Sequence, residues 1–323
     1  MRSITQPRSL LSRRDVLRST GAVGAGLALA ACGGNGEPAD GGTDSPTAGG
    51  QTGEPVDGND AVQEAFDAAG VSAEPTLTVL SATFETVAGT EERIQFALRD
   101  QEMQPVLDAQ VEAHLVSAAD RSVVVGPASP TYYAGQFSDQ GLYVFEQTVD
   151  EAGLYDLVVA TSDGQQAGTA VLSVVTPEQA QVILPGEPVP SVDTPTVDDK
   201  KNLEELCTRD PDCGMHETSL ADALEQGRPV VLTIATPKYC QTRVCGPVVD
   251  VVLATKEQVQ RDDIVFIHTE VFSDAGATPT EIVTALELPA EPWTFLIDAD
   301  GRVADRFFNA IVADVLTPAV EAL

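Results

Sequence analysis

The sequence predicts a two-domain protein in which an all-β sandwich is followed by an α/β domain. In the first half, short runs of alternating apolar and polar residues are separated by turn residues, a spacing typical of an antiparallel sandwich. Six such runs lie at residues 77–81, 93–98, 109–116, 141–149, 153–160 and 170–175. From Lys200 onward, apolar strand-like runs alternate with helix-like segments, as in an α/β sheet. The 323 residues are long enough for two such domains.

The first 31 residues carry the pattern of an export signal. The run Ser-Arg13-Arg14-Asp-Val-Leu-Arg resembles a twin-arginine signal, and an apolar segment follows at 21–31. That segment is too short to cross a membrane core of ~30 Å, which needs roughly 20 residues. Leu-Ala-Ala-Cys32-Gly resembles a lipobox, which implies cleavage before Cys32 and lipid attachment to its thiol. We therefore expect an exported protein, lipid-anchored to the outer face of the cytoplasmic membrane. The alternative is ordinary Ala-Xaa-Ala cleavage beside an incidental cysteine.

The chain is strongly acidic, with 18 Lys and Arg against 50 Asp and Glu and a net charge of −32. Loss of residues 1–31 removes five arginines and one aspartate and changes the net charge to −36. Binding to nucleic acid or to an anionic membrane by charge needs a basic footprint, so both are disfavoured. Such acidity suits a halophile-like protein in high salt, where the repulsion between like charges is screened.

Composition divides the exported chain into four segments. Residues 32–73 are rich in Gly, Pro, Asp, Thr and Ser and predict a flexible tether, with a short helix at 60–69. Residues 74–176 form the predicted sandwich. Residues 177–199 contain five prolines and predict a semi-stiff linker. The α/β domain occupies residues 200–323.

One motif relates the sandwich to a known architecture. Asp-Glu-Ala-Gly-Leu-Tyr155-Asp-Leu resembles the corner before a late strand of immunoglobulin-like domains, in which a tyrosine hydroxyl bonds back to the chain. The resemblance implies an immunoglobulin-like fold that acts as a spacer or a partner-binding module. We expect His114 to be structural or solvated, and Tyr132 and Tyr133 to pack.

Two cysteines directly follow a strand expected to be buried on both faces, at 229–235. If residues 240–245 were helical, the 1.5 Å rise would separate the Cα atoms of Cys240 and Cys245 by roughly 7.5 Å, beyond the ~7 Å limit for a disulfide. A bridge therefore requires a non-helical loop. Gly246 precedes a proline and is disfavoured in the helical region, so we expect the helix to start near Pro247.

The element order over residues 200–323 resembles the thioredoxin fold: strand, cysteine loop, helix, strand, helix, proline-led strand, hairpin, strand, helix. The run Glu-Pro292-Trp-Thr-Phe-Leu-Ile-Asp-Ala-Asp-Gly is similar to the cis-proline strand and hairpin of thiol reductases in this superfamily. The resemblance implies a cis peptide bond at Pro292. It also implies a redox-active pair, in which Cys240 attacks and Cys245 resolves.

The sequence departs from the thioredoxin pattern in two respects. Four residues separate Cys240 from Cys245, whereas thioredoxin-type loops have two. Ile234 stands where thioredoxins have a buried acidic residue, which normally transfers protons to and from the buried thiol.

Two further cysteines, Cys207 and Cys213, precede the first helix of this domain. An even number of cysteines in an exported domain points to two disulfides, and we expect nearest-neighbour pairing with Cys207–Cys213 as a structural staple. A metal site that includes His216 is the alternative for this segment.

Three functions follow from these features. The first is a membrane-anchored thiol–disulfide oxidoreductase without a cofactor, acting on protein or small thiol and disulfide substrates. The second is a non-catalytic surface binding protein whose cysteine pairs are structural bridges. The third is copper handling by Cys240, Cys245 and His268, because a cysteine just before a helix-starting proline resembles the copper-delivery members of the fold.

Overall fold

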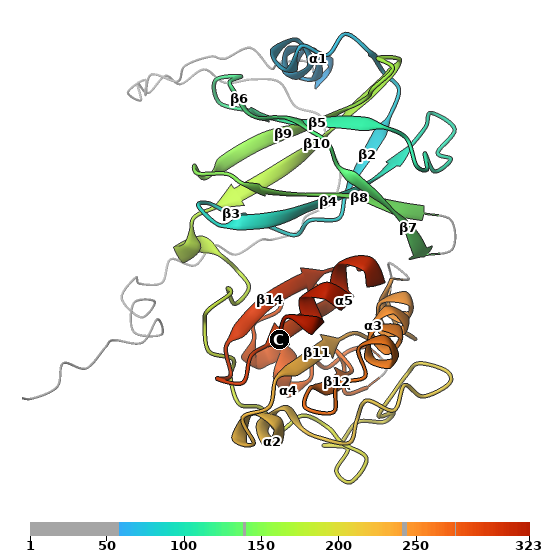
Figure 1. The fold of residues 1–323 in the computed structure, drawn as a ribbon, viewed down its shortest axis with the longest axis vertical. Coiled ribbons are helices and arrows are strands. Elements are labelled where there is room, and N and C mark those ends of the chain that lie inside the picture. The colour runs from blue at the N-terminus through green and yellow to red at the C-terminus, as the bar shows by residue number, and fades with distance from the viewer. Residues whose placement is uncertain (1–57, 138–139, 241–243, 275) are drawn as a thin grey trace, which may run out of the picture. The chain divides into compact units, whose positions relative to one another are not determined.

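Two β-sheets face each other across an apolar core in the first half of the chain (Figure 1). The computed structural model describes residues 58–137, 140–240, 244–274 and 276–323, so Arg13, Arg14 and Cys32 lie outside the described residues. One sheet has the path β1-β10-β9-β5-β6, with β3 also paired to β10, and the other has the order β2-β4-β8-β7. The strands of the first sheet are β1 (Glu74–Pro75), β3 (Thr86–Val87), β5 (Val111–Ser117), β6 (Val123–Ala128), β9 (Gly153–Thr161) and β10 (Gln166–Val175). Those of the second are β2 (Thr78–Ser81), β4 (Glu91–Arg99), β7 (Thr131–Phe137) and β8 (Gln140–Thr148).

Each of the six predicted runs overlaps one of these strands, and the predicted tyrosine corner is present. The Tyr155 hydroxyl donates a hydrogen bond to the Glu151 carbonyl oxygen at 2.8 Å. Tyr132 lies against Tyr143, with ring centroids 5.1 Å apart, as expected for a packing role. Strand β6 did not stand out in the sequence because it contains Gly126-Pro127, a pair that ordinarily marks a turn.

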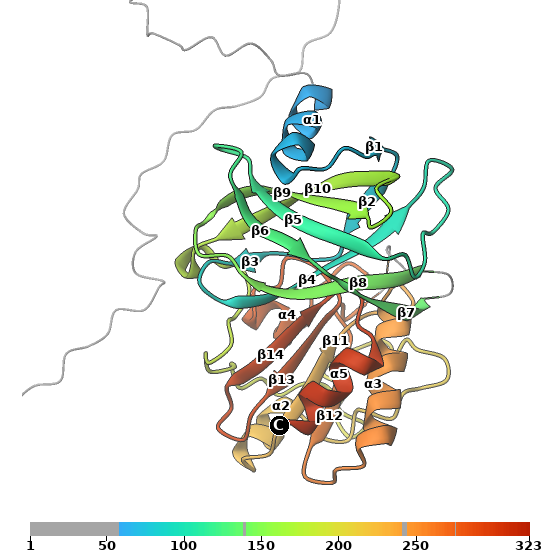
Figure 2. The ribbon, with the colours of Figure 1, turned by 45° about the horizontal axis from the view of Figure 1, so that its top comes forward.

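Helix α1 (Gly58–Ala69) belongs to the folded body, although the sequence places it in the tether. Its Ala65 and Phe66 are buried against Val116 and Val158 of the first sheet. Figure 2 shows the helix lying beside this sheet. The helix ends at Gly70, whose positive φ of 71° suits a residue without a side chain.

The second half of the described chain is a four-stranded sheet with helices on both faces. Its order is β12-β11-β13-β14; β11 and β12 are parallel and the other neighbours are antiparallel. The strands are β11 (Val230–Ile234), β12 (Val265–Thr269), β13 (Trp293–Ile297) and β14 (Val303–Phe308). The helices are α2 (Leu220–Glu225), α3 (Cys245–Val259), α4 (Glu281–Ala285) and α5 (Ala313–Glu321). Helices α3 and α5 pack on one face, and α2 and α4 contribute to the core on the other.

This order of elements is the one that the sequence predicts, with differences at the helix ends. Helix α3 begins at Cys245, two residues before the expected Pro247, and α4 is shorter than its sequence pattern. Strand β11 is buried on both faces because Val230, Leu232 and Ile234 join one core while Val231 joins the other. Among the described residues, no helix combines the length and apolar character needed to cross a membrane.

The proline-containing segment at 177–199 packs onto this second sheet. Val182, Val189 and Val192 are buried in the same core cluster as Phe295 of β13. The described residues from Gly58 onward accordingly belong to one compact unit. The segment therefore contributes to the core of the second sheet. The sequence does not show this, because the five prolines predict a linker.

Candidate functional site

A disulfide joins Cys240 to Cys245, with Cα atoms 6.1 Å apart. The predicted bridge is therefore present, and its second cysteine is the first residue of α3. Cys245 is fully buried, whereas Cys240 is partly exposed. A disulfide with one accessible sulfur reacts with external thiols at that sulfur, so the geometry favours Cys240 as the atom that exchanges with substrate.

Pro292 directly precedes β13 and follows Glu291, whose carboxylate lies 3.7 Å from the Cys245 sulfur. The Glu291–Pro292 peptide bond is cis, as the resemblance implies. Strand pairing sets Trp293 opposite Ile234, the last residue of β11, so Pro292 adjoins the point where the chain leaves β11 for the cysteine loop. The Pro292 carbonyl oxygen accepts a hydrogen bond from the Asn309 amide at 3.0 Å, which fixes this peptide against the chain beyond β14.

Glu291 places a carboxylate beside the buried sulfur, although Ile234 stands in β11 where thioredoxins keep an acid. One of its carboxylate oxygens, Oε2, lies 3.7 Å from the Cys245 sulfur. Burial raises the pKa of the Glu291 carboxyl; the Thr236 backbone N–H opposes this shift and the Glu270 carboxylate adds to it. A proton acceptor of raised pKa beside the buried sulfur can take the proton of the Cys245 thiol. The residue was missed because the acid comes from the cis-proline segment, not from β11.

A groove of about 630 Å³ runs beside the disulfide. Its walls are formed by residues that flank the two cysteines and by the loop that contains Cys207: Glu205, Cys207, Thr208, Arg209, Asp210, Pro237, Lys238, Gly246, Pro247 and Asp250. Lys238 pairs with Glu205 and Arg209 pairs with Asp250, at 2.8 and 2.7 Å. The groove gives the Cys240–Cys245 loop an open flank on which a substrate chain can lie.

The predicted Cys207–Cys213 disulfide is wrong, because both residues are free cysteines with sulfurs 3.7 Å apart. Two histidine rings lie against these sulfurs. His216 Nε2 is 3.2 Å from the Cys213 sulfur, and His268 Nδ1 is 3.3 Å from Cys213 and 3.7 Å from Cys207. We call these four residues the Cys2His2 cluster.

The structure also does not bring together Cys240, Cys245 and His268, the three residues expected to bind copper in the third function. Both ring nitrogens of His268 are engaged elsewhere, Nδ1 with the Cys2His2 cluster and Nε2 with the Ala235 carbonyl oxygen at 3.0 Å. The loop that carries Cys207 and Cys213 covers β12, so His268 meets this loop and not the one that contains Cys240.

Hydrogen bonds hold the cluster's loop against β12. The Thr208 amide and hydroxyl both donate to the buried Glu270 carboxylate, at 2.7 and 3.0 Å, and the His268 amide donates to the Met215 carbonyl oxygen at 2.9 Å. The contact with the Cys213 thiol lowers the pKa of the Cys207 thiol.

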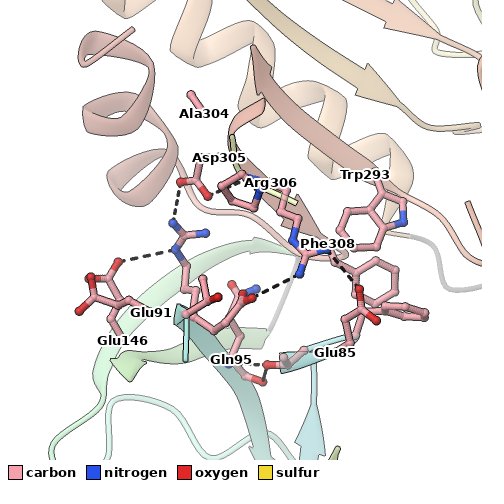
Figure 3. A pocket seen from close by; sticks show the side chains of 15 residues that line it. Glu85, Glu91, Gln95, Glu146, Trp293, Ala304, Asp305, Arg306 and Phe308 are labelled. Atoms are coloured by element: carbon pink, nitrogen blue, oxygen red, sulfur yellow. Dashed lines mark hydrogen bonds and ion pairs between the residues drawn. The ribbon is translucent and has the colours of Figure 1, made fainter. Parts of the chain in front are cut away.

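A second cavity, of about 400 Å³, lies where the sandwich meets β14 (Figure 3). Arg306 of β14 is 8% exposed and pairs with Glu85 at 3.2 Å and Glu92 at 3.3 Å. Arg93 of β4 pairs with Asp305 at 2.8 Å, and its guanidinium lies 4.3 Å from the centroid of the Phe307 ring. Each arginine already has carboxylate partners, so we interpret the cavity as part of the contact between the two sheet systems and not as a ligand site.

Comparisons with known proteins found solved structures that each resemble part of the chain. No family model matches the chain, and no curated protein matches it. A DsbF homologue from Corynebacterium diphtheriae is 18% identical, covering 46% of this chain and 97% of its own, with a TM-score of 0.30. A thioredoxin-family thiol:disulfide interchange protein from Chlorobium tepidum TLS is 15% identical over 45% and 97%, with a TM-score of 0.28. The Lin-41 filamin domain is 14% identical over 31% and 93%, with a TM-score of 0.23. The structural neighbours thus include thioredoxin-family and filamin-type proteins, each resembling part of the chain.

Proposed function

We propose that this protein is a thiol–disulfide oxidoreductase that uses the Cys240–Cys245 pair. The observation that carries the proposal is the disulfide itself: it has one accessible and one buried sulfur, stands at the start of α3, and has the Glu291 carboxylate 3.7 Å from its buried sulfur. Backbone N–H groups at the start of a helix stabilise a nearby thiolate when the disulfide is reduced.

The reaction is a pair of thiol–disulfide exchanges. In the reduced enzyme, the Cys240 thiolate attacks a substrate disulfide, a Cys240–substrate bond forms, and one substrate sulfur leaves as a thiolate that takes up a proton. The Cys245 thiol then gives its proton to the Glu291 carboxylate and attacks the Cys240 sulfur. The second substrate thiol leaves, and the disulfide seen in the structure is restored. The reverse sequence oxidises a substrate dithiol, and a dithiol or disulfide partner resets the enzyme in each direction.

An exchange assay tests this function directly. We expect the wild-type chain to accelerate reduction of insulin by dithiothreitol, and Cys240→Ser to return the rate to the uncatalysed background. Arg261→Ala, which removes an exposed ion pair with Asp263 and does not line the groove, is the control and should retain exchange if its circular dichroism spectrum is native. A wild-type rate equal to background would show that the bridge is structural, as in a non-catalytic binding protein.

We propose further that the enzyme works outside the cytoplasm, anchored by a lipid on Cys32. The support is the twin-arginine run followed by an apolar segment and a lipobox-like cysteine. Replacing Arg13 and Arg14 together by lysine is expected to leave the precursor in the cytoplasm. Cys32→Ala is expected to release an exported chain from the membrane fraction. Fractionation and immunoblotting measure both outcomes, and membrane retention of Cys32→Ala would contradict the lipid anchor.

A further inference from the structure

The Cys2His2 cluster presents four donor atoms with the dimensions of a tetrahedral metal site. The sulfurs of Cys207 and Cys213 and the ring nitrogens of His216 and His268 all lie within 4.8 Å of one another. In tetrahedral zinc sites, bond lengths of about 2.3 Å to sulfur and about 2.0 Å to nitrogen place two sulfurs about 3.8 Å apart and a sulfur and a nitrogen about 3.5 Å apart. The corresponding separations here are 3.7 Å between the sulfurs and 3.2, 3.3 and 3.7 Å between sulfur and nitrogen.

The surroundings of His268 prepare one of its nitrogens to bind a metal. Its Nε2 lies 3.0 Å from the Ala235 carbonyl oxygen, which can only accept a hydrogen bond, so Nε2 carries the proton. The Nδ1 lone pair is therefore directed toward the two sulfurs. A backbone carbonyl that fixes the tautomer of a histidine in this way is the usual outer partner of a metal-bound imidazole.

Burial and charge favour a metal with four protein ligands. His268 is 0% exposed, His216 is 1% and Cys213 is 7%, so the site is nearly closed to water. Two thiolates and two neutral imidazoles balance a divalent cation, which removes the cost of isolated charge in an apolar setting. Hard cations such as Ca²⁺ and Mg²⁺ prefer oxygen ligands, whereas this donor set suits zinc.

We propose that Cys207, Cys213, His216 and His268 form a structural Zn²⁺ site. The ion ties the loop at 207–216 to β12, and thereby supports the wall of the groove that flanks the Cys240–Cys245 disulfide. Cys207 also lines that groove, which gives the metal a path of entry. The site is separate from the redox pair and does not depend on the proposed exchange activity.

Zinc content of the full chain tests the site. The purified protein is reduced in the presence of a chelator, desalted, supplied with ZnCl₂ and desalted again before elemental analysis. We expect about one Zn²⁺ per wild-type chain. His216→Ala should weaken zinc binding by at least about 100-fold, because it removes a ligand and not only an outer partner. His216→Cys restores a fourth ligand and should keep the ion, which separates lost coordination from a lost fold.

Two controls and a spectrum make the test decisive. Cys240→Ser/Cys245→Ser leaves the Cys2His2 cluster intact and should retain one Zn²⁺, as should His114→Ala, which changes a buried histidine of the sandwich. Replacing zinc by Co²⁺ should give the intense visible bands of tetrahedral thiolate coordination, absent in His216→Ala. Substoichiometric zinc in the reduced wild-type chain would overturn the proposal. So would retention of copper but not zinc, or alkylation and mass analysis that finds Cys207 and Cys213 joined in a disulfide in the protein as purified.

Discussion

Replacing Glu291 by glutamine is expected to slow thiol–disulfide exchange by about 10²-fold, the lower range for loss of a general base. The carboxylate lies 3.7 Å from the Cys245 sulfur, and glutamine cannot accept the thiol proton there. The attack of Cys240 on substrate does not use this carboxylate, so the Cys240–substrate mixed disulfide should accumulate. Acid quenching and mass spectrometry detect that intermediate.

The pH profile should identify Glu291 as the proton acceptor. Burial raises its pKa above the ordinary value of 4.5, so the wild-type rate of resolution is expected to rise with pH through that raised pKa. In Glu291→Gln the rise of the resolution rate at the pKa of Glu291 should disappear. The rate should then rise only at the higher pH at which the Cys245 thiol ionises without a general base. Glu281→Gln, on the exposed first turn of α4, is the matched control and should change neither rate nor profile.

Stability separates this catalytic effect from structural damage. A carboxyl whose pKa is raised in the folded state binds its proton more tightly there than in the unfolded chain. Its contribution to stability therefore falls as pH rises from the ordinary pKa through the raised one. Glu291→Gln removes this loss, so the variant should be at least as stable as wild type at neutral pH. A slow variant that is also destabilised at neutral pH would contradict the assigned role.

Arg306→Ala is expected to lower the free energy of unfolding by about 3 kcal/mol, the lower end of the range for breaking a buried ion pair. The variant leaves Glu85 and Glu92 without their shared cation, which lies 3.2 and 3.3 Å away. It also removes the hydrogen bond from Arg306 to the Val182 carbonyl oxygen at 3.0 Å. Urea denaturation of the full chain measures the change.

The size of this loss should depend on pH. Burial already raises the pKa of Glu92, and Arg306 opposes the shift. Without Arg306 the folded-state pKa of Glu92 rises further, so the destabilisation should be greatest at neutral pH and should shrink as pH falls through the raised folded-state pKa values. Combining Arg306→Met with Glu85→Gln and Glu92→Gln should recover much of the stability, because no buried charge then lacks a partner. Arg261→Ala, at an exposed pair, is the control; an equal loss there would contradict the assignment.

The sequence predicts the fold well where one local pattern decides the structure. Alternation and turn residues locate six strands of the sandwich, and the run before Cys240 predicts a strand buried on both faces, as observed for β11. The cis peptide at Pro292 and the Cys240–Cys245 bridge are likewise confirmed. These features depend on residues that are near neighbours in the chain or belong to one recognisable motif.

The site was less predictable because its remaining parts meet only in three dimensions. Glu291 is 46 residues from Cys245, and nothing in its immediate sequence shows that its carboxylate points at a sulfur. His268 is 55 residues from Cys213. The spacing of Cys207 and Cys213 fits a disulfide as well as a metal site, and the histidine contacts that distinguish the two depend on how the loop lies over β12.

The packing of residues 177–199 also determines where this chain can be divided. A fragment that begins at Lys200, the predicted start of the α/β domain, loses Val182, Val189 and Val192 from its core. It also loses the Glu85 partner of Arg306. A fragment that keeps this core complete therefore begins before Val182, and one that also keeps the Arg306 ion pair includes part of the sandwich. Proteolysis at Val182, Val189 or Val192 requires these side chains to leave the core first, although the composition of the segment suggests an exposed cleavage site.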